Sequence, residues 1–190
     1  MGWKICHSDS RGKNILIFTQ TKLKGVFIIE PEKNEDIRGF FARVYDEKEF
    51  LKHKLETKFI QNSISINKKK GTIRGMHYQL HPFDEVKIVR CTKGRIFDVI
   101  IDLRKNSSTY KNWFSIELTD ENYKMLYIPS EFAHGFQTLE NNSEVFYQIS
   151  KEYNPKFSRG IRWNDPNFRI NWPINKIIIS EKDEKYLDYA

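Results

Sequence analysis

Residues 71–90 of this 190-residue chain place three chemically useful side chains among alternating apolar residues. A histidine moves protons near neutral pH, and a lysine ammonium stabilises negative charge that develops on an oxygen. A lone histidine on a strand more often has a structural role, so this stretch alone leaves both interpretations open. The three side chains are those of Arg74, His77 and Lys87.

Two strands are predicted in this stretch, at residues 74–79 and 86–93, because apolar residues alternate in both. The intervening residues 80–85, LHPFDE, carry loop signals. Side chains of a strand alternate between its two faces, so a hairpin would bring His77 and Lys87 close together in one cavity.

The composition is that of a folded globular chain of one domain, with 39% hydrophobic and 14% aromatic residues. The net charge of +7 suggests an anionic partner, but the lysines are dispersed and often accompanied by acidic residues. No basic stripe with interleaved aromatic residues is present, so nucleic acid is not the expected partner.

Cysteine usage and hydropathy predict the compartment. Cys6 and Cys91 are too few and too far apart for a disulfide framework or a thiolate zinc site, which favours a reducing cytoplasm. No apolar run has the length of a signal peptide or a membrane span, so we expect a soluble, cytoplasmic protein without a membrane partner.

Residues 1–22 have weak patterning apart from residues 15–18, which form either an extra edge strand or a remnant of the gene start. We therefore expect an N-terminal extension of unclear role at residues 1–22 and a single domain at residues 23–190.

Short strands at regular spacing predict an all-β sandwich or barrel. Asp46 can cap a helix at residues 47–52. In a sandwich the polar faces of strands can line an interior cup, and six polar residues are candidates for it. The further strands are predicted at residues 26–29, 40–45, 60–66, 95–103, 113–118, 124–128, 132–139 and 145–150, and the six candidates are Gln61, Arg74, His77, Lys87, His134 and Tyr147.

A metal site is the first alternative to weigh. Many double-stranded β-helix proteins bind a metal through a His-x-His pair, a following Glu and a later His. Here the pair reads His77-Tyr78-Gln79, while Glu85 and His134 stand at the later positions. Two histidines and one glutamate can bind iron or zinc, but the ligand set is incomplete, so no metal is the expectation.

A set of motifs in a fixed order points to a family. They are DIRGFF (36–41), RGMHYQ (74–79), KIVR (87–90), FDV (97–99), DLR (102–104), IPSEFAHGF (128–136), WNDP (163–166), WP (172–173) and SEKD (180–183). Through them the chain resembles the dTDP-4-dehydrorhamnose 3,5-epimerases, metal-free members of the cupin superfamily, from about residue 25 to residue 183.

The resemblance implies a double-stranded β-helix (cupin, or jelly roll) with a few short helices and no cofactor. It also implies a homodimer in which an N-terminal strand of each subunit joins the sheet of the other. The substrate it implies is a nucleotide-diphosphate sugar.

Catalytic roles follow from the same resemblance. His77 matches the general base and Asp183 the carboxylate that partners it. Lys87 matches the cation beside the sugar ketone, and Tyr147 the general acid on the opposite face.

Substrate contacts are implied as well. Arg38 and Arg74 match positions that contact the diphosphate, with Arg38 acting across the dimer. Gln61 and Tyr153 match positions near the nucleoside, and His134 matches a second, supporting histidine.

The chemistry requires such a set, because epimerising a carbon next to a ketone means removing its proton and returning one from the other face. The implied reaction acts on C3 and C5 of dTDP-4-dehydro-6-deoxy-glucose, on the route to dTDP-rhamnose and polysaccharides. Asn62 and Ser63 stand where the family often has Asp and Asn, and Met76, Ser108 and Glu131 also depart from it. GDP or CDP sugars, a C3-only or C5-only epimerase and a non-catalytic sugar-binding cupin therefore stay open as alternatives.

Overall fold

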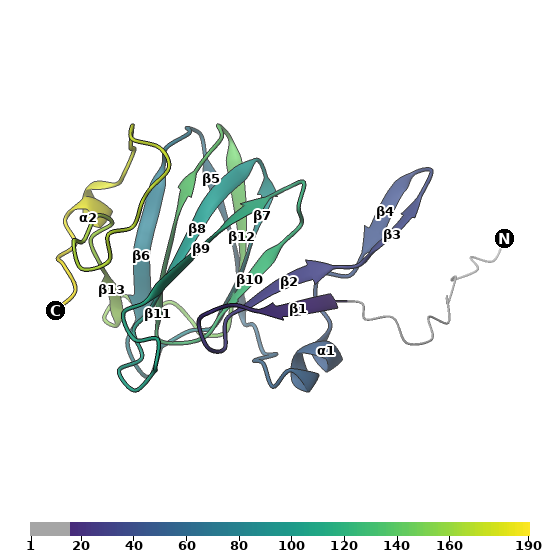
Figure 1. Ribbon diagram of the computed structural model, residues 1–190, viewed down its shortest axis with the longest axis horizontal. Coiled ribbons are helices and arrows are strands. Elements are labelled where there is room, and N and C mark those ends of the chain that lie inside the picture. Colours follow the sequence, from purple (N-terminus) through teal and green to yellow (C-terminus); the bar gives the residue numbers. More distant parts are fainter. Residues whose placement is uncertain (1–15) are drawn as a thin grey trace.

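In the computed structural model, which describes residues 16–190, two antiparallel sheets pack face to face (Figure 1). The larger sheet contains, in spatial order, β1 (Leu16–Gln20), β2 (Phe27–Pro31), β10 (Met125–Ile128), β7 (Lys87–Lys93), β12 (Ser143–Ile149) and β5 (Gln61–Asn67). The smaller sheet contains β13 (Ser158–Gly160), β6 (Ile73–Gln79), β11 (Phe132–Thr138), β8 (Arg95–Asp102) and β9 (Trp113–Thr119). The predicted all-β sandwich is confirmed.

Apolar side chains fill the space between the sheets and also cover part of each outer face. The inner cluster includes Val89, Ile100 and Phe136, all essentially inaccessible to solvent. A second cluster joins the outer face of the smaller sheet to the C-terminal segment, which lies beside β6 and β13 in Figure 1. The C-terminal segment is thus packed against the smaller sheet of the sandwich.

The predicted helix is confirmed as α1 (Glu47–Lys52). Asp46 caps it, because its carboxylate accepts hydrogen bonds from the backbone N–H groups of Lys48 and Glu49. Phe50 turns inward and is fully buried in the third cluster, on the outer face of the larger sheet. The second helix, α2 (Glu181–Glu184), lies near the C-terminus.

The prediction that residues 74–79 and 86–93 form a hairpin is wrong. β6 pairs with β11 and β13, whereas β7 pairs with β10 and β12, so the two strands belong to different sheets. The connection between them crosses from one sheet to the other. Alternating polarity is the same for both arrangements, and the sequence pattern therefore could not distinguish them.

The strand predicted at residues 26–29 is present as β2, but it lies inside the larger sheet and is not an edge strand free to join the sheet of a second subunit. β2 pairs with β10 on one side and with β1 on the other. Two interpretations of residues 15–18 were open, and the structure shows the first of them: β1 is the edge strand of the larger sheet. Residues 1–15 lie outside the described residues, so the boundary at residue 22 stays an expectation.

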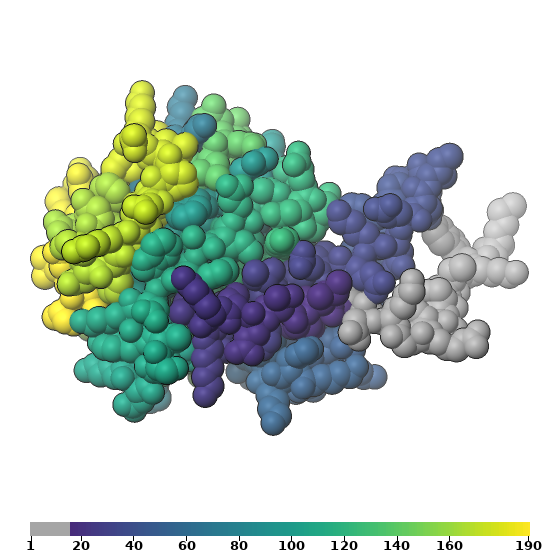
Figure 2. Space-filling model, in the orientation of Figure 1, coloured from purple at the N-terminus to yellow at the C-terminus, as the bar shows by residue number. Residues whose placement is uncertain are grey.

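A separate hairpin of β3 (Lys33–Asp36) and β4 (Gly39–Ala42), hereafter the arm, stands out from the body (Figures 1 and 2). Near its turn, the ring of Phe40 packs edge-on against Tyr123 at 4.8 Å. The Lys33 ammonium lies 4.3 Å from the centre of the Tyr123 ring. The strand expected at residues 40–45 is shorter in the structure, because β4 ends at Ala42.

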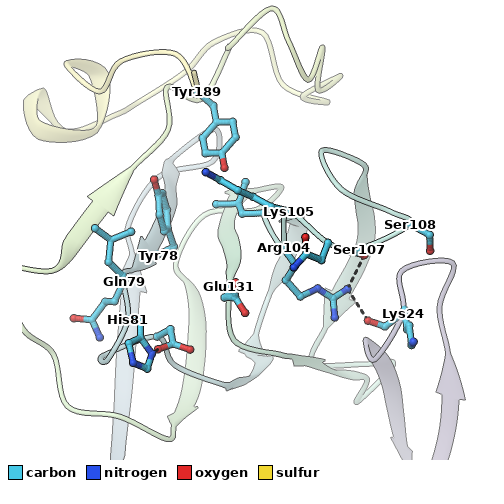
Figure 3. Close-up of a pocket in the computed structure, with 14 residues that line it drawn as sticks. Lys24, Tyr78, Gln79, His81, Arg104, Lys105, Ser107, Ser108, Glu131 and Tyr189 are labelled. Carbon is cyan, nitrogen blue, oxygen red and sulfur yellow. Dashed lines mark hydrogen bonds and ion pairs between the residues drawn. The ribbon is translucent and has the colours of Figure 1, made fainter.

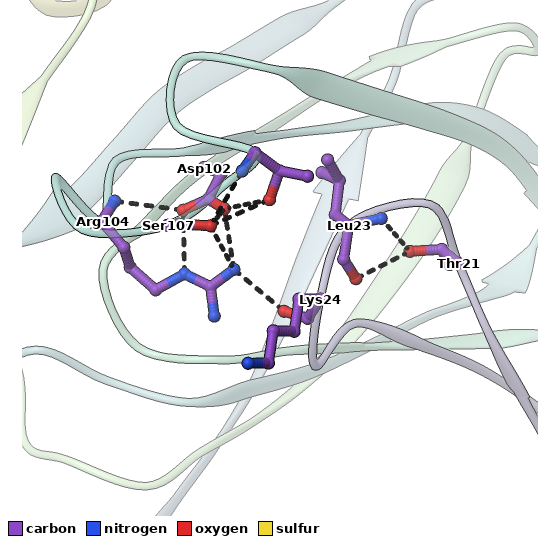
Figure 4. A network of polar contacts seen from close by, with 7 residues as sticks. Thr21, Leu23, Lys24, Asp102, Arg104 and Ser107 are labelled. Atoms are coloured by element: carbon purple, nitrogen blue, oxygen red, sulfur yellow. Dashed lines mark hydrogen bonds and ion pairs between the residues drawn. The ribbon is translucent and has the colours of Figure 1, made fainter.

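A polar network closes the end of β8 (Figure 4). Asp102 is fully buried and accepts hydrogen bonds from Arg104, Ser107 and Thr109. Burial acts to raise the pKa of Asp102, but these donors outweigh it and bring the value to about 2. Arg104 also donates to the backbone carbonyl of Lys24, so the network ties the loop after β8 to the turn between β1 and β2.

Candidate active site

His77 and Asp183 form a hydrogen-bonded pair between β6 and α2. The His77 Nε2 atom lies 2.8 Å from Asp183 Oδ1, and Asp183 Oδ2 accepts from the backbone N–H of Gly75 at 3.2 Å. Burial acts to raise the pKa of Asp183, but the hydrogen bond from His77 and the charges nearby bring it below its usual value. Asp183 is therefore a carboxylate that fixes the ring of His77 and leaves Nδ1 for another partner.

Ser180 explains why Asp183 is ordered in a charged segment. Its hydroxyl caps α2 by accepting from the backbone N–H of Asp183, and Ile178 bridges to Thr72 at the start of β6. Tyr186 follows α2 and meets the His77 ring edge-on at 5.9 Å. These contacts hold the C-terminal segment against β6.

His134 lies directly opposite His77 on the neighbouring strand β11, so both imidazoles face the interior. His134 Nε2 lies 2.7 Å from Asp98 Oδ1 on β8, and both side chains are buried. Burial raises the pKa of Asp98, against the opposing effect of His134. This second pair lies deeper in the sandwich than the first, since His77 is partly exposed.

Lys87 and Tyr147 come from the facing sheet. Val89 pairs with Tyr147, and Lys87 pairs with Ile149, so Lys87 and Tyr147 lie on the same inner face of β7 and β12. The Tyr147 ring meets the His134 ring edge-on at 6.0 Å. Burial raises the pKa of Tyr147, and the charge of Asp98 adds to the effect, so the phenol keeps its proton.

The Lys87 ammonium lies 2.7 Å from Glu85 Oε1. Their side chains are only 11% and 7% exposed, which makes this a shielded ion pair inside the candidate site. From the sequence, Glu85 was a candidate only as a metal ligand, and this contact with Lys87 was not predicted.

Three residues predicted to bind substrate, Arg74, Gln61 and Tyr153, form hydrogen bonds around the same interior. The Arg74 guanidinium donates to Asn67 Oδ1 at 2.7 Å, which ties β6 to β5 of the facing sheet. Gln61 Oε1 accepts from the backbone N–H of Tyr153 at 3.2 Å. The structure therefore brings Gln61 and Tyr153 together, as the resemblance implies.

Lys182 is a cation of α2 that was not among the residues predicted from the sequence. It precedes Asp183, and the neighbouring Tyr186 raises the pKa of its ammonium. The SEKD motif contained it, but a lysine in a charged segment carries little signal of its own.

Arg38 is the one predicted site residue that lies apart from the others. It sits at the tip of the arm, where its side chain is 86% exposed and pairs with Asp36. The arm points away from β6 (Figure 1). Within one chain, Arg38 is therefore not part of the site around His77.

A cavity of about 1080 Å³ lies on the other side of the smaller sheet (Figure 3). Tyr78, the neighbour of His77 on β6, lines it together with Tyr189, Lys105 and Glu131. Gln79, the last residue of β6, lines it as well, whereas His77, Lys87 and Tyr147 are not among its lining residues.

The metal alternative was based on His77, Glu85 and His134. Each has a protein partner of its own: Asp183, Lys87 and Asp98 respectively. Among residues 16–190, no group of three or more histidine, cysteine, aspartate or glutamate side chains is arranged to hold a metal ion.

The family model for dTDP-4-dehydrorhamnose 3,5-epimerase matches residues 20–190. The chain belongs to this family. The dTDP-4-dehydrorhamnose 3,5-epimerase of Methanothermobacter thermautotrophicus is 42% identical over 172 residues, which cover 89% of this chain and 92% of that protein.

Solved structures of the family have the same fold. The crystal structure of the dTDP-4-dehydrorhamnose 3,5-epimerase from Elizabethkingia anophelis superposes with a TM-score of 0.90 at 36% identity, covering 93% of this chain and 97% of that one. The dTDP-6-deoxy-D-glucose-3,5-epimerase from Legionella pneumophila, in complex with dTDP-4-keto-L-rhamnose, gives 0.86 at 31% identity, covering 91% and 92%.

Membership of this epimerase family settles the class of the protein. It is an isomerase that acts on sugar nucleotides, and its sandwich is the cupin-type jelly roll that the resemblance implied. Among residues 16–190, no helix has both the length and the apolar character needed to cross a membrane.

Proposed function

We propose that the protein epimerises C3 and C5 of a dTDP-linked 4-keto-6-deoxy sugar, by default dTDP-4-dehydro-6-deoxy-glucose, to give dTDP-4-dehydrorhamnose. The observation that carries the proposal is the placement of His77, held by Asp183 of α2, on one sheet and of Lys87 and Tyr147 on the inner face of the other. A base and an acid on opposite sides of one interior are what inversion at carbon requires.

Proton removal is the role of His77. Its Nε2–H donates to Asp183, so the lone pair of Nδ1 takes the proton from the carbon next to the ketone. The C–H bond breaks, and its electron pair moves toward the ketone oxygen to give an enolate. The carboxylate of Asp183 stabilises the imidazolium that forms.

Enolate stabilisation is the role of Lys87. Its ammonium is shielded from water, and a shielded charge acts more strongly on a developing oxyanion than an exposed one does. The oxygen at C4 therefore binds beside Nζ.

Proton return is the role of Tyr147. Because burial raises its pKa, the phenol stays protonated until a strongly basic carbon faces it. The O–H bond breaks as the new C–H bond forms on the face opposite His77. The His77 imidazolium then releases its proton to solvent and the Tyr147 phenolate takes one up, which restores both residues, and no cofactor takes part.

The nucleotide half of the substrate binds to the polar groups around the interior. Arg74 is assigned to the diphosphate, Gln61 and Tyr153 to the nucleoside, and His134 supports the site through Asp98 and Tyr147. A guanidinium suits phosphate because its donors form paired hydrogen bonds. The nucleoside diphosphate thus anchors the sugar between base and acid.

Arg38 is proposed to reach the site of a second copy of the chain, in a homodimer. Support comes from the arm, where Phe41 is 69% exposed and Ile37 fully exposed, and from the outer face of β5, where Ile64 and Ile66 are more than 60% exposed. Apolar surface of this extent favours burial against a partner. Since β1 pairs within its own chain, the arm rather than β1 is the element assigned to the exchange.

Proton magnetic resonance in D2O tests the reaction. With dTDP-4-dehydro-6-deoxy-glucose, deuterium should replace hydrogen at both C3 and C5 while the rhamno-configured product accumulates. Deuterium at only one of these carbons would make the protein a mono-epimerase, and parallel incubations with GDP and CDP sugars would identify the nucleotide.

Tight binding of the nucleotide sugar without any exchange at high enzyme concentration would refute catalysis and leave a sugar-binding cupin. Light scattering tests the dimer separately. A stable monomer at micromolar concentration would remove Arg38 from the site.

A further inference from the structure

Glu85 has one engaged oxygen and one free oxygen. Oε1 lies 2.7 Å from the Lys87 ammonium, whereas Oε2 is buried and has no hydrogen-bond partner in the described part of the chain. The side chain is 7% exposed, so bulk water does not readily satisfy the free oxygen. Buried carboxylate oxygens are nearly always hydrogen-bonded, and an unpartnered one next to a reaction centre calls for a donor.

The charge balance limits what that donor is. Lys87 already neutralises the carboxylate, so a second cation would bring an excess positive charge into a shielded place, which is costly. A neutral hydroxyl satisfies the oxygen at no such cost. The substrate class of this family carries hydroxyls on its sugar.

We infer that Glu85 determines specificity by accepting a hydrogen bond from the C3 hydroxyl of the sugar through Oε2, while Oε1 holds Lys87 in place. The inference rests on the proposed function, in which the ketone oxygen at C4 binds beside Lys87. Of the two carbons that flank this ketone, C3 carries a hydroxyl and C5 carries a methyl group. One carboxylate thus bridges the ammonium at C4 and the hydroxyl at C3, as a bidentate acceptor does.

Exchange at C5 gives a readout that does not need the C3 hydroxyl. The experiment compares dTDP-4-keto-6-deoxyglucose with its 3-deoxy counterpart, and measures kcat/KM for deuterium incorporation at C5 in D2O. A hydrogen bond to a charged group contributes enough to favour the hydroxylated sugar by roughly 10- to 100-fold in the unaltered enzyme.

Glu85→Gln keeps the shape and one acceptor oxygen but removes the charge. It should narrow this preference by about five- to tenfold, since a neutral hydrogen bond is about half as strong. Glu85→Asp keeps the charge that offsets Lys87 and withdraws the carboxylate by one methylene, so it should narrow the preference as well. The aspartate variant takes the place of the glutamine variant in this test if the glutamine variant does not fold.

Asp84→Asn is the matched control, because this neighbouring carboxylate contacts His81 at 3.2 Å, outside the site. It should leave the preference unchanged. A preference near one in the unaltered enzyme would overturn the inference without any variant. So would folded Glu85 variants that lose rate equally on both sugars, because Glu85 would then act only through Lys87. If the proposed function itself is wrong, the unaltered enzyme will incorporate no deuterium into the hydroxylated sugar. That result is different from both of the outcomes above.

Discussion

Asp183→Asn is the sharpest test of the proton-transfer assignment, because it changes one charge and almost no volume. The carboxylate accepts from both His77 and the Gly75 N–H, at 2.8 and 3.2 Å. An amide offers one oxygen and one NH2 group, so it can satisfy only one of these donors. If the NH2 group meets His77, the imidazole must place its own proton on Nδ1 and cannot act as a base there.

The magnitude follows from these two bonds. Replacing each charge-assisted bond by a neutral or lost one costs about 1 kcal/mol, or about 2 kcal/mol in total. For a chain of this length that lowers the unfolding midpoint by roughly 4–8 °C. Misplacing the general base costs more, about 10²- to 10⁴-fold in kcat.

The assay follows deuterium at C3 and C5 together with the thermal midpoint. Both exchange rates should fall by the same factor, because one base serves both carbons, and His77→Ala gives the background. The folded pKa of Asp183 lies below its ordinary 3.8, so its contribution to stability is present above that value and is lost as the pH falls through the folded pKa. The stability difference between the parent and Asp183→Asn should therefore shrink in acid. A folded Asp183→Asn enzyme with undiminished exchange would refute the role of this pair.

Three further predictions use other groups. Tyr147→Phe should keep proton removal by His77, so exchange with retained configuration should outpace product formation; full epimerisation at the parent rate would show that another acid acts. Asp102→Asn should remove about 2 kcal/mol of stability near neutral pH and little near pH 2, because the folded pKa of Asp102 is about 2, and urea unfolding at several pH values measures this. In a Cys6→Ser variant, Cys91 should react with a thiol reagent only on unfolding, since burial raises its pKa to about 12; fast labelling of this variant in its native state would contradict the burial of Cys91.

The sequence predicted the positions of the strands and of the first helix better than it predicted which strands pair. Alternation located β6 and β7 within a residue or so, and Asp46 located the start of α1. Alternation repeats every two residues whatever the neighbouring strand is, so it could not tell a hairpin from a crossover between sheets. The residues predicted for the site still face one interior despite this error, because inward-facing side chains from two packed sheets come together as readily as those from a single hairpin.

The candidate site was predicted from motifs, and its partners were visible only in three dimensions. Asp183 is more than a hundred residues from His77 in sequence, and only the packing of α2 against β6 joins them. Glu85 shows the opposite case. It stood in the most informative stretch, two residues before Lys87 and so on the same side of an extended chain, but it was considered only as a metal ligand.

The contact between the arm and its own body has a consequence for mixed populations of subunits. Phe40 packs against Tyr123 of the same chain and the arm points away from β6 (Figure 1), so each site in the proposed dimer draws on two chains. Two inactive variants, Arg38→Ala and His77→Ala, should then complement each other: in a heterodimer one site receives an intact histidine and an intact arm, and the other receives neither. Random mixing makes half of the dimers heterodimers, so about a quarter of the parent activity should return on unfolding and refolding the two proteins together.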